Sequence, residues 1–323
     1  MNKSAIFAIV TVIVLVCLFL VYPVLFIDFP IEKKAYPSLG INKKIQSSID
    51  YNSHIWMEGN TIYGSVKLRK ENNQVVDTVI KLYRFVTVVG SSNPSILLKD
   101  KFLSGNSEDS TYYKSGLKIE SFLIGTTEVS NVFWHIFKNR GSDLIYDESS
   151  AFYVLFPQCN LKYEECVSFL EELSSVLKRK FRLPTFHEWL FAASGGVKSK
   201  GYIYSGSNDI NKVAWYKLNL ISGLSQSFPP GYTGHPIANK LPNELDIYDM
   251  SGNVKEFTST IYGDFYSEIG LGILNSFLLR NFQDIHTPIT MGGDTNSDSD
   301  GCRIDLFPSG TSSLAGFRII MEP

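Results

Sequence analysis

Two carboxylates flank a short glycine turn in the segment DMSGNVKEF, which runs from Asp249 through Glu256 to residue 257. Gly252 permits a tight turn, because glycine has no Cβ and adopts positive φ at little cost. Across such a turn the two side chains can converge, with main-chain carbonyl oxygens between them. Carboxylates and backbone oxygens at about 2.3–2.6 Å are the ligands of a hard cation. The alternative is a plain turn in which the carboxylates accept backbone hydrogen bonds.

Thiols form a second group that can do chemistry, and the chain has four cysteines. Cys17 lies in an apolar N-terminal run, which leaves the odd set Cys159, Cys166 and Cys302. At most one intrachain disulfide can form among these three. Cys159 and Cys166 are close enough in sequence to pair, but spacing alone does not establish disulfide geometry. The alternative is three reduced and partly buried thiols.

Three helices are expected to position these groups. Residues 128–139 carry apolar side chains near helical spacing, and residues 163–180 carry a clearer apolar stripe that ends in basic residues, as suits a helix C-terminus. A third helix is predicted to start at Thr185. Thr185 and Glu188 have the spacing of a capping box, and Pro184 stops any helix before it.

The remaining sequence is typical of strands and loops. Residues 61–68 and 75–89 are rich in β-branched and aromatic residues and predict strands. Residues 91–116 are dense in Ser, Asn, Gly and Asp, which indicates a loop. After about residue 198 the chain is punctuated by Gly, Pro, Asn and Asp. A few helices followed by a long region of loops and short strands predict an irregular α+β domain.

Composition excludes two classes of protein. Apolar residues make up 44% of the 323 residues and charged residues 19%, so the chain can bury a sizeable core and is not disordered throughout. The net charge is −2. A nucleic-acid partner would need a basic face to displace counterions from phosphates, so none is expected.

Residues 5–27 are apolar and uncharged, and a helix of that length crosses a hydrocarbon core of about 30 Å. The run is longer than the apolar region of a signal peptide and lacks a small-residue cleavage site. No small residue stands just before Cys17, so lipoprotein processing is not expected either. We therefore predict an uncleaved transmembrane anchor.

Five segments resemble the signature blocks of the formylglycine-generating-enzyme (sulfatase-modifying factor) family, whose fold is related to C-type lectins. Any one segment would be weak, but five in the right order are specific. The resemblance covers roughly residues 84–321 and implies an irregular, loop-rich α+β fold. The segments are FLIGTTEVSN (122–131), RLPTFHEWLFAASGG (182–196), NELDIYDMSGNVKEF (243–257), MGGDTNSDSDGCR (291–303) and GFRII (316–320).

The resemblance also divides the chain into parts. Residues 1–27 would be the anchor, residues 28–83 a juxtamembrane segment that is partly β, and residues 84–323 the sulfatase-modifying-factor-like domain. Lysines flank the apolar run on both sides, so the positive-inside rule does not set its orientation. The resemblance alone places the domain outside the cytoplasm, in the periplasm or the extracellular space.

For the glycine turn, the resemblance implies a structural Ca²⁺. Asp249 and Glu256 would bind it through their side chains, and Gly252 and Val254 through their main-chain carbonyls.

The block at 291–303 decides the expected chemistry. Active members of the family place two cysteines in this block, five residues apart, which bind Cu(I) and activate O₂ to oxidise a substrate cysteine. Aligned on Gly292 and Gly293, these positions fall on Ser297 and Cys302. A serine hydroxyl is a poor ligand for soft Cu(I), so only Cys302 stays a candidate catalytic residue. Its alternative role is that of a small buried apolar side chain.

These inferences lead to one expected function and one alternative. We expect a membrane-anchored, non-catalytic binding or assembly module whose partner is an envelope protein, a peptide or a glycan. The alternative is a copper-dependent oxidase that uses Cys302 and Cu⁺ to convert a protein cysteine to formylglycine, or a related thiol oxidase. An iron-dependent sulfoxide synthase ranks below both, because the five histidines are scattered along the chain.

Overall fold

The computed structural model describes residues 55–70, 72–92, 94, 98–99, 111–112, 117–142, 145–147, 156–219, 234–268, 285–305 and 315–323. Its strands are β1 (Ile55–Glu58), β2 (Thr61–Arg69), β3 (Val75–Val88), β4 (Leu98–Lys99), β5 (Thr111–Tyr112), β6 (Phe122–Gly125), β7 (Ile145–Asp147), β8 (Phe181–Arg182), β9 (Glu256–Ile261), β10 (Pro288–Met291), β11 (Gly316–Phe317) and β12 (Ile320–Met321). Its helices are α3 (Asn131–Lys138), α4 (Tyr163–Leu177), α5 (Phe186–Ala193), α6 (Ile210–Val213) and α7 (Tyr262–Glu268), with 3-10 turns η2 (Gly196–Lys198) and η5 (Asp300–Cys302).

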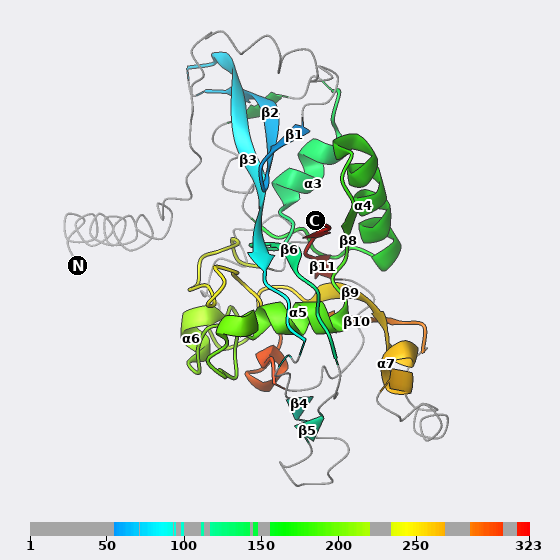
Figure 1. Cartoon of the computed structure of the whole chain (residues 1–323). Helices are drawn as coiled ribbons and strands as arrows, with labels where there is room; N and C mark the ends of the chain where they lie inside the picture. Colours follow the sequence, from blue (N-terminus) through cyan, green and yellow to red (C-terminus); the bar gives the residue numbers. More distant parts are fainter. Residues whose placement is uncertain are drawn as a thin grey trace, which may run out of the picture.

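The largest sheet has the strand order β1-β2-β3-β6-β12-β8, and β7 adds to β2 in parallel. β3 is its longest strand and pairs with β2 over Val75–Arg84 and with β6 over Phe85–Val88. β3 therefore connects the β1–β2–β3 meander at one end of the molecule to the strands beside α5 (Figure 1). The predicted boundary between residues 83 and 84 falls inside this strand.

Aromatic side chains fill the core between this sheet and the helices α3 and α4. Phe169 of α4 packs edge-on against Phe133 and Phe137 of α3, with ring centroids 5.5 and 4.7 Å apart. The ring centroid of Tyr83 on β3 lies 5.5 Å from that of Phe133, so β3 contributes to the same core. This cluster explains the apolar stripes that predicted the two helices.

A second core lies around α5 and the smaller sheet, whose strand order is β10-β9-β11. Trp189 and Phe186 of α5 are fully buried there, together with Ile289 and Met291 of β10. β11 runs parallel to β9 and leads directly into β12 of the large sheet. The two sheets are thus linked through the C-terminal strands.

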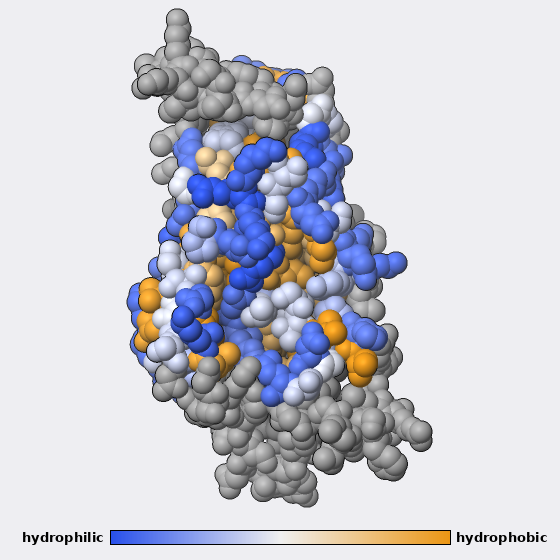
Figure 2. Space-filling view, turned by 45° about the vertical axis from the view of Figure 1, so that its right-hand side comes forward, coloured by the Kyte–Doolittle hydropathy of each residue, from blue (hydrophilic) through white to orange (hydrophobic). Residues whose placement is uncertain are grey.

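The displayed surface is mixed in character. In Figure 2 apolar residues appear as separate patches, with hydrophilic residues between and around them. The most exposed large apolar side chains among the described residues are Leu218, Leu241, Val197 and Val89.

The structure confirms the three predicted helices as α3, α4 and α5, and the two predicted strands as β2 and β3. Within residues 91–116 the described part is not only loop, since β4 pairs with β5. The predicted anchor, residues 5–27, lies outside the described residues. Within the ranges that the structure describes, no helix is long and apolar enough to span a membrane.

Candidate functional site

The helix α5 begins at the residue that the sequence predicted, and its Trp189 contacts the buried site. The Thr185 hydroxyl accepts a hydrogen bond from the Glu188 amide at 3.2 Å, and the Glu188 carboxylate accepts one from the Thr185 amide at 2.9 Å. Arg182 donates two further hydrogen bonds to Glu188, both at 2.7 Å. This N-terminus fixes α5 so that Trp189, one turn later, points into the protein.

Under α5 lies a completely buried ion pair. Arg318, which leads into β12, donates to both carboxylate oxygens of Glu256 on β9, at 3.0 and 2.7 Å. Trp189 Nε1 donates to Glu256 Oε2 at 2.7 Å. The remaining donors of Arg318 reach the carbonyls of Gly125 and Tyr248, at 3.0 and 2.9 Å. Every oxygen of the Glu256 carboxylate is therefore engaged.

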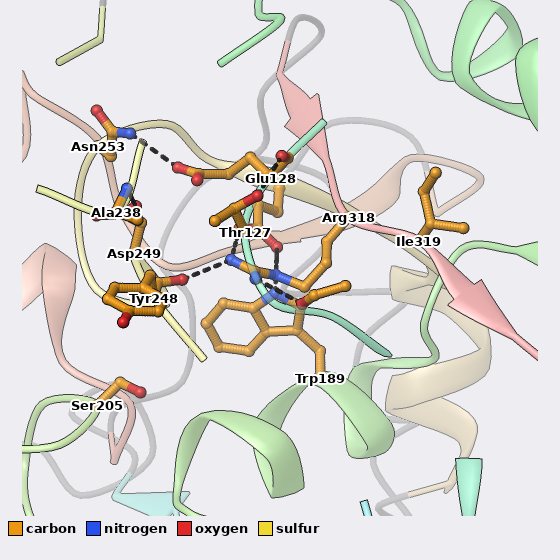
Figure 3. Close-up of polar contacts among 12 residues, drawn as sticks. Thr127, Glu128, Trp189, Ser205, Ala238, Tyr248, Asp249, Asn253, Arg318 and Ile319 are labelled. Atoms are coloured by element: carbon orange, nitrogen blue, oxygen red, sulfur yellow. Dashed lines mark hydrogen bonds and ion pairs between the residues drawn. The ribbon is translucent and has the colours of Figure 1, made fainter. Parts of the chain in front are cut away.

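A second buried acidic group lies beside this pair (Figure 3). Glu128 is fully buried and Asp249 almost so. Glu128 Oε1 accepts a hydrogen bond from Asn253 at 2.9 Å, and Asp249 Oδ2 accepts one from the Ala238 amide at 2.5 Å. The other two oxygens, Glu128 Oε2 and Asp249 Oδ1, are buried and receive no hydrogen bond from a described donor. Each carboxyl group thus has one oxygen available for a proton or a cation.

The electrostatics of the two carboxyls are coupled. Burial raises the pKa of Asp249 to about 6, and the neighbouring Glu256 charge adds to this effect, while Arg318 opposes it. Burial also raises the pKa of Glu128 well above its usual range, with the charge of Asp249 as the next cause. Two carboxylates in one dry site cannot both ionise without compensation. The arrangement fits either one shared proton or a bound cation.

The glycine turn that connects Asp249 to β9 has the backbone geometry that the sequence predicted. Asp249, Gly252 and Asn253 all have positive φ, at 57°, 79° and 62°. A Cβ on Gly252 would lie 2.2 Å from the Trp215 carbonyl oxygen, so only glycine fits there. Asn253 closes the turn, because its side chain donates to Glu128 and accepts from the His235 amide at 2.8 Å.

The predicted calcium ligands therefore lie in two different environments. Asp249 has a buried oxygen without a donor, whereas Glu256 is bound by Arg318 and Trp189. The carboxyl group that shares the Asp249 environment is Glu128, which sequence reasoning missed. Glu128 lies more than a hundred residues earlier, in the segment FLIGTTEVSN. The available signal was that Glu128 is the one charged residue of this segment.

The block expected to hold copper is compact and has a single thiol. Ser297 donates to Asp294 Oδ1 at 2.8 Å and accepts from the Asp294 amide at 3.0 Å, so its hydroxyl is part of a local turn. A Cβ on Gly301 would lie 3.0 Å from Ser297 Cβ, and one on Gly293 would lie 3.0 Å from Cys302 Sγ. Ser297 therefore lies against Gly301, and Cys302 lies against Gly293.

Cys302 itself has the environment of a buried apolar side chain. It is fully buried and packs with Tyr204, Val213 and Tyr216. Burial raises the pKa of its thiol to about 12, and the charge of Asp294 raises it further, while Lys255 lowers it slightly. In the absence of a metal ion, a thiol of that pKa is protonated at neutral pH and is a weak nucleophile.

The remaining cysteines do not complete a thiolate pair. Among the described residues, no disulfide joins Cys159, Cys166 and Cys302. Cys166 belongs to α4 and is buried in the first core, whereas Cys302 is buried in a different cluster. In the part of the chain that the structure describes, no three His, Cys, Asp or Glu side chains are grouped so as to hold a metal ion.

One aromatic stack borders the acidic site. The Trp215 ring lies 3.9 Å from the His235 ring and nearly parallel to it, and Lys240 Nζ is 3.9 Å from the Trp215 ring centre. Burial lowers the pKa of His235 to about 4, with the Lys240 charge as the second cause. His235 is therefore neutral at physiological pH and serves as a packing group.

Comparison with known proteins adds to this geometry. A family model for the sulfatase-modifying factor enzyme 1-like domain matches residues 93–323. The chain is 45% identical over 85 residues to a chaperone protein LppX of Paenibacillus barcinonensis, which covers 24% of this chain and 30% of that protein. It is 34% identical over 83 residues to inactive C-alpha-formylglycine-generating enzyme 2 of Bos taurus, which covers 25% of this chain and 27% of that protein. The matches thus span less than a third of these relatives.

A solved structure shares the fold. Treponema denticola variable protein 1 superposes with a TM-score of 0.50 at 18% sequence identity, over 77% of this chain and 96% of that one. At this identity the likeness concerns the fold alone. The family match extends over most of the chain and includes α3 to α7 and the buried acidic site, whereas β1, β2 and β3 precede it. The chain therefore belongs to the family of sulfatase-modifying factor enzyme 1-like domains.

Proposed function

We propose that this chain is a non-catalytic binding or assembly module built on the sulfatase-modifying factor fold. The observation that carries the proposal is the loop around Gly293, which contains Ser297 and Cys302. Ser297 is held by Asp294, and Cys302 is buried with a raised thiol pKa of about 12. Copper-dependent oxidation needs two thiolates that can approach one Cu(I). This loop offers one thiol, that of Cys302.

The names of the relatives support this direction. One is called a chaperone protein and another an inactive formylglycine-generating enzyme. On this fold the loops form the surface, so binding residues can change there without unfolding the core. We propose a peptide, protein or glycan of the cell envelope as the ligand. The module would be tethered by residues 5–27, with its domain on the periplasmic or extracellular side of the membrane.

We further propose that the acidic site binds a structural Ca²⁺. The support is the pair of buried oxygens, Glu128 Oε2 and Asp249 Oδ1, that receive no hydrogen bond from a described donor. Carboxylate oxygens are the ligands that Ca²⁺ prefers, and a cation there would offset two buried negative charges. In this proposal Glu128 joins Asp249, Gly252 and Val254 as a ligand. Glu256 then acts through Arg318 and holds the surrounding elements in place.

The absence of catalysis is tested by mass spectrometry on a cysteine-containing sulfatase peptide incubated with the purified protein, copper and O₂. We expect no loss of mass, because no aldehyde forms. Turnover that disappears in Cys302→Ser would overturn the proposal and establish the oxidase alternative.

Two serine variants of the same loop sharpen this test. Ser297→Cys restores a thiol at the position that matches active relatives, whereas Ser299→Cys adds one two residues away as a matched control. Turnover in Ser297→Cys alone would show that the protein still binds the peptide and that the missing thiolate explains the lack of activity. No turnover in either variant would mean that other positions needed for the reaction have also diverged.

A further inference from the structure

β3 carries a long edge that lacks a described partner strand. β2 pairs with β3 from Val75 to Arg84, and β6 pairs with the opposite edge only from Phe85 onward. Among the described residues, nothing pairs with this second edge between Val75 and Tyr83. Figure 1 shows this part of β3 on the outer side of the meander, with β2 and β1 on its other side. Such an edge offers a row of backbone donors and acceptors to another strand.

The side chains on the solvent face of this edge are complementary in charge. Asp77 and Lys81 are exposed, and Val79 between them is half-buried. All three alternate along one face, because successive side chains of a strand point to opposite sides. Across the ladder to β2, Lys67 lies opposite Asp77 and Ser65 lies opposite Val79.

We propose that two copies of this chain associate through their β3 edges, antiparallel and related by a two-fold axis at Val79. An antiparallel pairing centred on Val79 places Asp77 of each copy opposite Lys81 of the other. The contact is therefore self-complementary, with two opposite-charge pairs around a Val79–Val79 contact. Each Asp77 would lie between Lys67 of its own β2 and Lys81 of the second copy.

The charges favour a second copy over an unrelated strand. Proteins that keep an edge unpaired commonly place charged side chains, especially lysine, or proline along it. Here the charges are of opposite sign and symmetric about one residue, and the segment has no proline. Of the two strands at the ends of this sheet, β1 and β8, the strand β8 has only two residues and offers little to pair with.

Cysteine cross-linking of the full-length protein in mild detergent tests both the contact and its register. Residues directly opposite in antiparallel strands have Cα atoms about 4.5–5.5 Å apart, within the range that a disulfide spans. We expect Val79→Cys to form a covalent dimer under mild oxidation. We expect Asp77→Cys and Lys81→Cys to cross-link to each other when mixed, several-fold more than either variant alone.

The control is Ser65→Cys, on the same face of the sheet but on β2, together with the unaltered protein to measure dimers through its native cysteines. Equal yields from Ser65→Cys and Val79→Cys, or no cross-link at position 79, would overturn the proposal. Self-linking of Asp77→Cys above the mixture would overturn it too, because the register would differ. Unchanged melting temperatures show that a negative result does not come from misfolding.

Discussion

At the scale of single residues, the buried centre of this protein carries an unbalanced charge. Glu128, Asp249 and Glu256 face a single guanidinium, that of Arg318, and all four side chains are buried. The bidentate geometry satisfies Glu256, so the surplus lies on the other two carboxyls. A buried charge without compensation is costly, and the usual outcome is a raised pKa or a bound cation. The following two predictions distinguish these outcomes.

The first prediction concerns pH in calcium-free buffer. Asp249 has a folded pKa of about 6 against a usual value of 3.8, so the folded state holds this proton more tightly than the unfolded chain. The resulting stability is present below about pH 4 and is lost as the pH rises through about 6. A pKa difference of about two units corresponds to a change of at most about 3 kcal/mol in the free energy of unfolding. We expect Asp249→Asn to remove this fall in the free energy of unfolding, as measured by denaturant titration.

Carboxylates with lowered pKa, such as Glu188 and Glu322, contribute the opposite slope in both proteins. The informative quantity is therefore the difference between native protein and variant across the pH range. If that difference stays constant from about pH 4 to pH 7, Asp249 has no raised pKa in the folded state.

The second prediction separates the calcium ligands. We expect Ca²⁺ to raise the melting temperature of the native protein and EDTA to reverse the effect, since a ligand that binds only the folded state stabilises by about 2.7 kcal/mol at a hundredfold excess over its Kd. Glu128→Gln should abolish this response. Glu256→Gln should lower stability with or without calcium, because it weakens the partner of buried Arg318. A calcium response that survives in Glu128→Gln and vanishes only in Glu256→Gln would support the ligand set predicted from sequence.

At the scale of elements, the third prediction concerns the start of α5. Thr185→Ala removes the acceptor for the Glu188 amide, and the loss of such a cap costs about 1 kcal/mol. The helix carries Trp189 to Glu256, so the variant should also loosen the buried pair. We expect a lower free energy of unfolding and faster hydrogen exchange in α5. Ser194→Ala, at the other end of the helix, is the control and should have a smaller effect, because its hydroxyl bonds only the Phe191 carbonyl.

The local elements could be predicted because their signals are local. The apolar stripe of α4, the capping box at Thr185 and the glycine turn before Glu256 each lie within a few residues. The partners within the site could not, since Glu128 meets Asp249 and Arg318 meets Glu256 across long sequence separations. A capping or turn rule contains no information on which distant carboxyl shares a site. For the same reason, the sequence predicted Glu256 as a calcium ligand, although the distant Arg318 binds its carboxylate.

At the scale of the whole molecule, the fourth prediction concerns topology. We expect residues 5–27 to anchor the chain and the domain to lie outside the cytoplasm. A reporter that is active only after export, fused after residue 323, should then be active, and a cytoplasmic reporter at the same position should be silent. The reverse pattern, or a mature N-terminus beyond residue 27, would contradict the proposed location. The fusion point follows the last strand, so the fold stays intact.

The contact between Tyr83 and Gly125 limits where the chain can be truncated and which substitutions it can accept. The Tyr83 hydroxyl donates to the Thr127 carbonyl and accepts from the Ile319 amide, at 2.9 and 3.1 Å, and a Cβ on Gly125 would lie within 1.9 Å of that hydroxyl. Tyr83 precedes the segment matched by the family model, yet its hydroxyl links the main chain at Thr127 to that at Ile319, next to Glu128 and Arg318 of the buried centre. A fragment that begins at residue 93 would lack Tyr83 and leave the Thr127 carbonyl and the Ile319 amide without these hydrogen bonds. Among natural variants of this chain, replacement of Gly125 by a larger residue should occur only together with a smaller residue at position 83.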